Sequence, residues 1–298
     1  MDHVRPVEPL RIAVLMTCHN RAPKTLAALA SLRDQRGLPA GTVLSVHLVD
    51  AGSTDGTARA VAEHFPDVEV VTVGQDVFWG EGMRTASRRS RHGALPAWDH
   101  QLWLNDDVRL TADAVADLLA TAERTGGRAV VVGALHSSDG ARTTYSGRRR
   151  TLPRWHPRSH VFVLVDPTGA PEPCDTCNGN VVLVPRRVRD RLGDIDRRFR
   201  HSMGDFDYGL RARRAGIPLY VTPRYVGACD TNPPLSGSRE PGIGVREALR
   251  RLVSQRELPP RQWWAFCHRH LWPWAPLLMV APYARTALAA ALDRARRA

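Results

Sequence analysis

The chain carries at residues 101–107 the stretch Gln-Leu-Trp-Leu-Asn-Asp-Asp, in which an apolar run ends in one amide and two carboxylates. The run is short and apolar, as expected of a buried β-strand. Carboxylates at a strand's end suit a divalent cation that also holds a diphosphate. Mg²⁺ and Mn²⁺ prefer oxygen ligands, and Mg²⁺ usually keeps one or two carboxylates plus phosphate oxygens. A solvated turn or a helix N-cap is the competing interpretation of Asn105, Asp106 and Asp107.

Strand-like and helix-like segments alternate around this stretch. The strand-like segments are residues 12–16, 43–49, 68–73 and 101–104, and the helix-like segments between them include residues 25–33 and 57–65. This spacing predicts βαβ units and a parallel sheet covered on both faces. In such sheets ligands bind beyond the carboxyl ends of the strands. Polar residues 17–21, 50–56 and 105–107 all fall at those ends, so the sequence predicts one site at one edge of the sheet.

The second part of the chain, residues 128–228, is less regular. It shows strand-like segments at 129–135, 161–165 and 181–184, and a helix at 204–215 that Gly216 ends. The segment 142–158 is loop-like and contains only basic charges: Arg142, Arg148, Arg149, Arg150, Arg154 and Arg158. Residues 245–256, 261–270 and 277–297 are typical of appended helices. We therefore expect a domain over residues 1–228, with halves at about 11–127 and 128–228, and a helical appendage over residues 229–298.

The net charge restricts the partners. The 298 residues include 42 Lys and Arg against 30 Asp and Glu, a formal charge of +12. Such a surplus attracts nucleic acid, anionic lipid headgroups or phosphorylated small molecules, although an Arg-rich soluble surface also explains it. The five cysteines are scattered and odd in number, and we expect them to be reduced.

Neither targeting nor spanning segments are expected. The first ten residues are polar and do not resemble a signal peptide. The best candidate for a membrane span, residues 271–284, contains Pro273, Pro276 and Pro282 and is shorter than the ~20 residues that a spanning helix needs. The sequence therefore predicts a cytoplasmic protein.

Four motifs stand in an order that resembles a known family. They are Thr17-Cys18-His19-Asn20-Arg21, Asp50-Ala51-Gly52-Ser53-Thr54-Asp55-Gly56-Thr57, Asn105-Asp106-Asp107 and Gly204-Asp205-Phe206-Asp207-Tyr208-Gly209-Leu210-Arg211. Over residues 11–228 the chain resembles the inverting family 2 glycosyltransferases. The resemblance implies the α/β fold called GT-A, in which a Rossmann-like nucleotide-binding half and an acceptor half share one mixed, mainly parallel sheet.

The resemblance also implies roles for single residues on the donor side. Thr17, His19, Asn20 and Arg21 match positions where the end of the first strand meets the base and ribose, and Asp50 matches an acid that hydrogen-bonds the base. Many members carry a second acid next to this one, where the chain has Ala51. Asn105, Asp106 and Asp107 match the Asp-x-Asp region. Asp107 is implied as the direct ligand of Mn²⁺ or Mg²⁺, with Asp106 beside it and nearer the ribose and phosphates.

Asp205 matches the catalytic base of the family. Inverting transfer displaces the diphosphate in line at the anomeric carbon, so one carboxylate must take the proton of the acceptor hydroxyl. A divalent ion offsets the charge that builds on the leaving diphosphate. We expect the dipole of the helix that begins here to favour the ionised form of Asp205. The competing interpretation is that Asp205 and Asp207 are first-turn acids that only stabilise the helix.

Trp79 and Asn178 are two further candidate site residues, with weaker support from the sequence. Trp79 lies in a Gly-containing turn, residues 78–83, that resembles the loop bordering the donor sugar, and it is either a stacking residue or a core aromatic. Asn178 lies in residues 178–180, which resemble the border between donor sugar and acceptor but are equally typical of a tight turn.

The C-terminal segment concentrates charge and aromatic residues. Ten arginines, three acidic residues and four of the eight tryptophans follow residue 245. Arg-flanked, Trp-rich helices suit the surface of an anionic bilayer. A helical cap on the catalytic domain or a dimer contact is the alternative. No recognised nucleic-acid-binding motif is present.

The motifs together predict a hexosyl- or deoxyhexosyltransferase. It would move a sugar from a nucleoside diphosphate donor to a hydroxyl of a glycan, a lipid-linked saccharide or a small molecule. Cell-surface polysaccharide or lipid-linked glycan synthesis at the inner face of the plasma membrane is the expected setting. Two alternatives stay open. A nucleotidyltransferase is disfavoured because no glycine lies between Arg11 and Lys24, and the other alternative is a non-catalytic module that binds sugar nucleotides or membranes.

Overall fold

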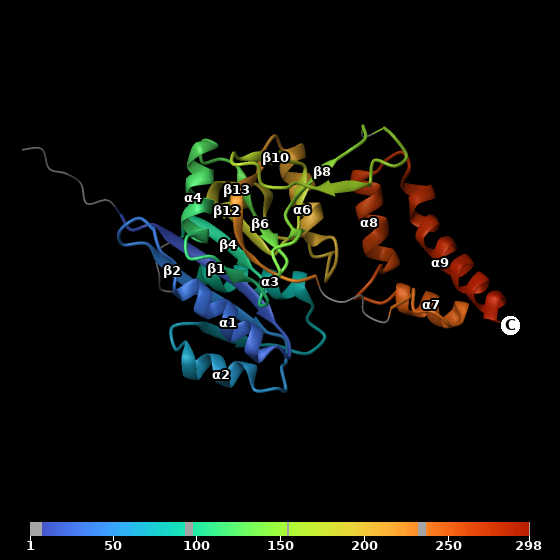
Figure 1. Ribbon diagram of the computed structural model, residues 1–298, viewed down its shortest axis with the longest axis horizontal. Coiled ribbons are helices and arrows are strands. Elements are labelled where there is room, and N and C mark those ends of the chain that lie inside the picture. The colour runs from blue at the N-terminus through green and yellow to red at the C-terminus, as the bar shows by residue number, and fades with distance from the viewer. Residues whose placement is uncertain (1–7, 93–97, 154, 232–236, 298) are drawn as a thin grey trace, which may run out of the picture.

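The computed structural model describes residues 8–92, 98–153, 155–231 and 237–297 (Figure 1). Its strands are β1 (Arg11–Cys18), β2 (Val43–Asp50), β3 (Glu69–Thr72), β4 (His100–Leu104), β5 (Arg109–Leu110), β6 (Val130–His136), β7 (Thr143–Tyr145), β8 (Gly147–Arg150), β9 (Phe162–Leu164), β10 (Glu172–Cys174), β11 (Thr176–Cys177), β12 (Val181–Pro185) and β13 (Leu219–Ala228). Its helices are α1 (Ala22–Arg33), α2 (Thr57–His64), α3 (Trp79–His92), α4 (Ala114–Arg124), α5 (Arg186–Leu192), α6 (Gly204–Arg214), α7 (Val245–Leu252), α8 (Pro260–His270) and α9 (Ala275–Arg297).

One mixed sheet runs through the molecule in the order β10-β13-β6-β12-β4-β1-β2-β3. The strands β4, β1, β2 and β3 are parallel neighbours, whereas β12 lies antiparallel between β4 and β6. The carboxyl ends of β1, β2 and β4 therefore lie at one edge, and β12 begins there because Val181 pairs with Leu104. β13 is parallel to β6 and also ends at this edge. The expected α/β sheet is confirmed.

Both faces of the sheet are buried, as the apolar runs predict. Along β1, Ile12 and Val14 join the core under α1, α2 and α4, while Ala13 and Leu15 join the core under α3, α5 and α6. The alternation follows from the two-residue period of a strand. Such a doubly covered sheet is rigid, and it holds the loops at its edge in place.

Two expectations about local structure are wrong. Residues 78–83 are not an isolated turn, because helix α3 begins at Trp79. Its glycines allow close packing: a Cβ at Gly80 would collide with the carbonyl of Phe199, and one at Gly82 would lie 2.5 Å from Thr17 Oγ1. The second wrong expectation is the loop over residues 142–158, which contains β7 and β8. The position of Arg154 in it lies outside the described residues.

The three C-terminal helices pack beside the sheet and cover neither of its faces (Figure 1). A separate core joins Phe199 and Leu210 to Phe266, Leu271 and Leu278, so α8 and the start of α9 rest on the end of α6. Helix α7 ends at Leu252, earlier than expected. The appendage is thus attached to the catalytic part by a small apolar core of its own.

Helix α9 confirms the helix expected over residues 277–297, and its length contradicts the expectation that no segment here is long enough to span a membrane. Pro282 lies inside the helix and has no N–H to give to the carbonyl of Leu278, four residues earlier. Trp263 Nε1 of α8 donates to that carbonyl at 2.8 Å and replaces the missing bond. Within the described residues α9 is the one helix long and apolar enough to cross a membrane by length and composition, and only 11% of its apolar window is buried.

Candidate active site

The ends of β1 and β2 are joined by side-chain bonds. His19 Nδ1 donates to the carbonyl of Ala51 at 2.8 Å, and Asn20 Oδ1 accepts the N–H of Thr54 at 2.7 Å. The backbone N–H of Asn20 donates to Ser53 Oγ at 2.9 Å. Asn20 has a φ of 50°, a left-handed conformation that Asn tolerates better than most residues. The first two motifs therefore form one rigid edge.

Asp50 has one buried oxygen without a partner. The residue is 1% exposed. Its Oδ1 accepts the N–H of Ser53 at 3.1 Å and also the hydroxyl of Ser53. Its Oδ2 has no hydrogen-bond partner among the described residues. Buried polar atoms almost always have partners, so an N–H of a bound ligand fits this position.

Asp106 and Asp107 share a cation from the first motif. Arg21 Nη1 lies 2.9 Å from Asp107 Oδ2 and 3.5 Å from Asp106 Oδ1. Burial raises the pKa of Asp106 to about 7, with Asp107 adding to the rise and Arg21 opposing it. A buried carboxyl with a raised pKa is ionised more readily when a cation lies beside it, which suits a site for cations and phosphates.

The donor set at this point fits a divalent ion that is carried by the substrate. Asp106 and Asp107 offer hard carboxylate oxygens, which is the set that Mg²⁺ or Mn²⁺ uses when phosphates and water complete its shell. The described residues contain no cluster of three or more His, Cys, Asp or Glu side chains that could hold a metal by itself. The ion would therefore enter with the donor.

Sequence reasoning missed Cys229 at this point. It follows β13, and its thiol donates to Asp107 Oδ1 at 3.5 Å. Burial strongly raises the pKa of this thiol, with the charge of Asp107 adding to the effect, so the thiol stays protonated as a donor. Only its position after a strand that ends at the same edge could have indicated this contact. All five cysteines are free and buried.

Trp79 connects the acidic pair to the turn before β12. Its Nε1 donates to Asn105 Oδ1 at 2.9 Å. The other end of the indole faces Gly179, where a Cβ would lie 2.6 Å from the ring. Trp79 also packs edge-on against Trp103, with 6.2 Å between ring centroids. Both interpretations of this residue thus have support, since Trp79 is partly in the core and also part of the wall of the site.

Asp205 lies on the far side of this turn. Its Oδ2 accepts the backbone N–H of Gly179 at 2.9 Å, and its Oδ1 accepts the N–H of Phe206 at 2.8 Å. Desolvation nevertheless raises the pKa of Asp205, although these N–H groups and the charge of Arg148 oppose the rise. The N–H groups at the start of the helix favour the ionised form, as expected, but loss of water outweighs them. A carboxylate with a raised pKa is a stronger base.

Arg148 is the second residue that sequence reasoning did not place. Its Nε donates to Asn178 Oδ1 at 3.0 Å, and its guanidinium lies over the ring of Phe206 at 5.6 Å. The cluster of arginines in residues 142–158 indicated a basic segment, but no feature of the sequence distinguished Arg148 from the other arginines. Its neighbour Arg149 instead pairs with Glu172 at 3.1 Å on the outside of the sheet.

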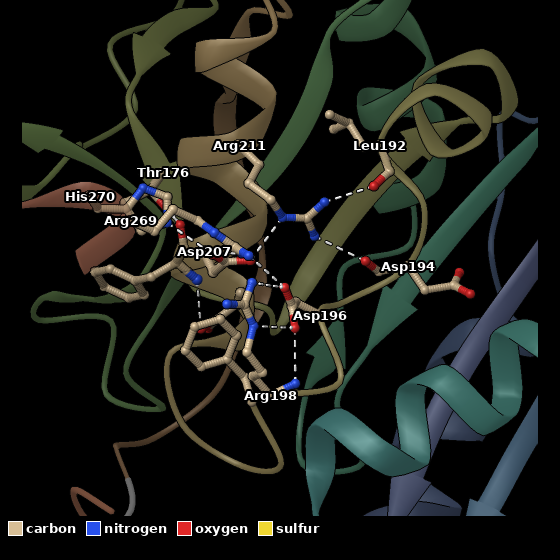
Figure 2. A network of polar contacts seen from close by, with 12 residues as sticks. Thr176, Leu192, Asp194, Asp196, Arg198, Asp207, Arg211, Arg269 and His270 are labelled. Carbon is tan, nitrogen blue, oxygen red and sulfur yellow. Dashed lines mark hydrogen bonds and ion pairs between the residues drawn. The ribbon is translucent and has the colours of Figure 1, made fainter. Parts of the chain in front are cut away.

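Asp207, two residues after Asp205, has a structural environment (Figure 2). It is 0% exposed and faces Arg211 at 2.8 Å, Arg269 at 2.6 Å and His270 at 2.9 Å. Arg211 also donates to the carbonyls of Leu192 and Asp194. The interpretation as a helix-stabilising acid therefore fits Asp207, whereas Asp205 faces the turn that borders the site.

The remaining predicted residue, Thr17, packs under Gly82 of α3. All of the predicted site residues thus gather at the edge formed by the ends of β1, β2 and β4 and the start of β12. Backbone bonding also links the two halves, since the N–H of Asn105 donates to the carbonyl of Asn180 at 3.0 Å.

Comparison with known protein sequences matches the chain to glycosyltransferases. Residues 13–181 match the family model for glycosyl transferase family 2. The chain is 25% identical over 228 residues to an N-acetylglucosaminyl-diphospho-decaprenol L-rhamnosyltransferase of Mycobacterium tuberculosis, which covers 70% of this chain and 73% of the relative.

Solved structures share the fold. Residues 1–349 of S. aureus TarS, in complex with UDP, superpose with a TM-score of 0.54 at 12% identity, covering 87% of this chain and 70% of that fragment. The mannosyltransferase PcManGT from Pyrobaculum calidifontis, in complex with GDP-Man and Mn²⁺, gives a TM-score of 0.52 at 17% identity over 98% of this chain and 90% of the other. At these identities the likeness concerns the fold, and it confirms the expected GT-A architecture.

Proposed function

The chain belongs to glycosyl transferase family 2 and so transfers a sugar from a nucleotide sugar, and we propose that it does so with inversion, with a divalent ion, onto a hydroxyl of a lipid-linked saccharide. The observation that carries the proposal is the arrangement around Trp79, whose indole reaches from Asn105 to Gly179. The indole lies between two acidic groups. On one side are Asp106 and Asp107, which suit a metal diphosphate, and on the other side is Asp205, a single carboxylate with a raised pKa. An in-line displacement needs this division between the leaving-group side and the nucleophile side.

The donor side recognises the nucleotide. Asp50 Oδ2, buried without a partner, accepts an N–H of the base, and the loop fixed by Asn20 and Ser53 frames the ribose. Arg21 places a positive charge beside Asp106 and Asp107, where the diphosphate lies. Asp107 and Asp106 would hold Mn²⁺ or Mg²⁺, which would supply charge stabilisation for the leaving diphosphate. One solved relative in fold, PcManGT, was captured with Mn²⁺.

The acceptor side holds the base. Asp205 Oδ1 and Oδ2 each accept one backbone N–H, which fixes the orientation of the carboxylate and leaves lone pairs for the acceptor hydroxyl. Asp205 removes the proton as the hydroxyl oxygen attacks the anomeric carbon, and the raised pKa makes it a better acceptor at neutral pH. Arg148 and Asn178 border the acceptor next to it.

The proposed acceptor class and location rest on the appendage and on the named relative. The Mycobacterium tuberculosis relative is named for a diphospho-decaprenol substrate. On α9 the side chains of Leu277, Val280, Leu288 and Leu292 are 51–61% exposed and recur at helical spacing. Such a stripe, with arginines at the helix end, suits the surface of an anionic bilayer. Peripheral attachment at the inner face of the plasma membrane follows, in the synthesis of a surface glycan.

The nucleotide panel is the test of this function. Thermal unfolding is measured with UDP, dTDP, GDP, CMP and ADP, each with and without Mn²⁺. A ligand at ~100 times its dissociation constant adds roughly 2.7 kcal/mol to the stability of the folded state, enough to move a melting temperature by several degrees. We expect one nucleoside diphosphate to stabilise the protein mainly in the presence of metal. No shift from any nucleotide would contradict the donor-site assignment.

A further inference from the structure

Helix α9 has more apolar surface than the rest of the protein covers. Besides its exposed stripe, a second face carries Leu278, Ala281, Pro282, Ala289 and Ala290, together with the polar residues Arg285, Thr286 and Asp293. A helix with apolar side chains on more than one face is normally buried in a core or in lipid. Only 11% of the apolar window of α9 is buried within the protein.

The second face of α9 forms one wall of a groove. The groove has a volume of about 1060 Å³, and residues 237–243, α7 and α8 form the other walls. Its apolar lining includes Ile243, Leu252, Leu258, Trp263, Leu278 and Ala289. A volume of this size is at the upper end of the range for small-molecule sites.

The acidic side chains in the lining already have partners in the protein. Glu257 accepts the N–H of Ser238 at 2.8 Å and its hydroxyl at 2.6 Å. Glu240 pairs with Arg251, and Asp293 accepts the N–H of Gly242 at 2.7 Å. These acids are satisfied inside the protein and do not call for a polar ligand, which leaves the apolar wall as the surface that a ligand would contact.

The groove lies next to the acceptor side of the active site. Glu257 of its lining accepts from Ser202 Oγ through its backbone carbonyl at 3.0 Å, three residues before Asp205. His160 also lines the groove, and Phe162, two residues later in the chain, packs edge-on against Phe206 at 5.8 Å. These two contacts join the segments that form the groove wall to Ser202 and Phe206, which lie on either side of the base in the sequence.

The groove lining also carries positive charge. Arg285 and His160 both line the groove. Burial lowers the pKa of His160, and the charges of Arg285 and Arg150 add to the lowering, so the imidazole is neutral and Arg285 supplies the charge. An apolar channel with a guanidinium group in its lining complements a molecule that is a hydrocarbon chain joined to a diphosphate.

We propose that this groove binds the isoprenoid chain of a lipid-diphosphate acceptor, with the diphosphate at Arg285 and the saccharide directed toward Asp205. The inference deepens the proposed function and rests on it for the identity of the acceptor. Its occupant is a single lipid molecule, whereas the outer stripe of α9 faces the bilayer from which that lipid is drawn. Chain burial in the groove is favourable in proportion to the apolar area removed from water.

Binding of farnesyl diphosphate tests the groove. Affinity is measured by calorimetry on the full chain in EDTA, so that no metal holds the diphosphate at Asp107, and inorganic diphosphate serves as the comparison. We expect farnesyl diphosphate to bind about tenfold or more tightly than inorganic diphosphate, since only the former fills the groove. Equal affinity for the two would overturn the proposal.

Two matched variants locate the binding. Ala289→Trp fills the groove from an exposed position, and Ala291→Trp adds the same side chain at an exposed position of α9 outside the lining. We expect Ala289→Trp to lose the preference for farnesyl diphosphate and Ala291→Trp to keep it. Equal loss in both variants, or in neither, would speak against the groove.

Photo-crosslinking of the unaltered protein gives a readout that does not depend on any variant. A diazirine-bearing farnesyl diphosphate should label peptides from residues 237–263 and the inner face of α9. Labelling confined to the outer stripe, such as Leu288 and Leu292, would mean simple partition onto the helix and would overturn the proposal. Neither experiment measures sugar transfer, so failure here is distinct from failure of the nucleotide panel.

Discussion

Arg269, on α8, donates a 2.6 Å hydrogen bond to the buried carboxylate of Asp207, two residues after the proposed base. The same guanidinium reaches Asp196 at 2.8 Å (Figure 2). The C-terminal appendage thus contacts the helix that carries the base through a buried ion pair, and not only through apolar packing. A residue more than sixty positions later in the chain thus holds the first turn of the helix that carries Asp205.

Replacing Arg269 should damage both stability and transfer. We expect Arg269→Met to lower the free energy of unfolding by about 2–4 kcal/mol, because a buried carboxylate loses one of its partners. Transfer should slow by about tenfold while nucleotide binding is unchanged, since Arg269 bonds Asp207 and Asp196 rather than a donor-side residue. Chemical denaturation and single-turnover rates provide the measurements.

Arg198→Met is the matched control for that variant. Arg198 also pairs with Asp196, at 2.7 Å, but its side chain is 51% exposed. Its loss should cost less than about 1 kcal/mol. If Arg269→Met were no more harmful than Arg198→Met, the appendage would have no role in positioning the base.

Asp50→Asn should weaken nucleotide binding. The change replaces one carboxylate oxygen of Asp50, either the buried Oδ2 or the neighbouring Oδ1, by an NH₂ group. An NH₂ group cannot accept an N–H from the base. Loss of a charge-assisted bond of roughly 1.5–3 kcal/mol predicts an affinity lower by about 10- to 100-fold. Equilibrium binding of the stabilising nucleotide with Mn²⁺ measures it. Inorganic diphosphate with Mn²⁺ should bind both proteins equally, and a matching loss there would show general damage to the site.

As the pH is lowered, the rate of transfer should begin to fall at a higher pH than an ordinary aspartate would give. Asp205 must be ionised to accept the proton, and desolvation raises its pKa. Activity is therefore present above this raised pKa and is lost as the pH falls through it. We expect the acidic limb of kcat/KM above the value near 4 that is usual for an aspartate. A limb at or below about pH 4 would exclude Asp205 as the titrating base.

Arg148 should influence the pH at which kcat/KM falls on the acidic side. Its positive charge opposes the rise in the pKa of Asp205, so Arg148→Met should move the limb to higher pH. Arg149→Met is the control, because Arg149 is 46% exposed and pairs with Glu172. An equal shift in both variants would point to the overall charge of the protein.

The outer stripe of α9 should mediate binding to anionic vesicles. Replacing Leu277, Val280, Leu288 and Leu292 by Ser removes the exposed apolar side chains and keeps every arginine. Flotation with phosphatidylglycerol vesicles should lose most of the bound protein, because the cations alone give weak, salt-sensitive attachment. Undiminished flotation of the variant would remove the interfacial role of the helix.

The sequence predicted the sheet and the residues of its polar edge, because both depend on local patterns. Apolar runs and the motif at Asn105 lie within single segments, and parallel strands bring such segments to one edge. The position of Cys229 depends on β13 returning to this edge from 122 residues away, which no local pattern encodes. Arg148 was one of six arginines that looked alike in the sequence.

The wrong expectations share a physical cause, which is compensation by a distant group. Gly80 and Gly82 suggest a turn, but tight packing against Phe199 and Thr17 explains them within a helix. Pro282 suggests a break, but Trp263 bonds the carbonyl that the proline leaves open. The raised pKa of Asp205 reflects water excluded by neighbouring elements, which outweighs the helix dipole that the sequence alone suggests.

The most direct test of the proposed reaction is single-turnover transfer by Asp205→Asn at saturating donor. Asparagine keeps the size of the side chain but cannot take a proton, and a missing general base typically costs about 10²–10⁴ in rate. We expect the variant to bind the donor nucleotide with the affinity of the natural protein and to transfer sugar slower by at least about a hundredfold. Transfer at the natural rate would show that another group removes the proton, and that Asp205 is not the base.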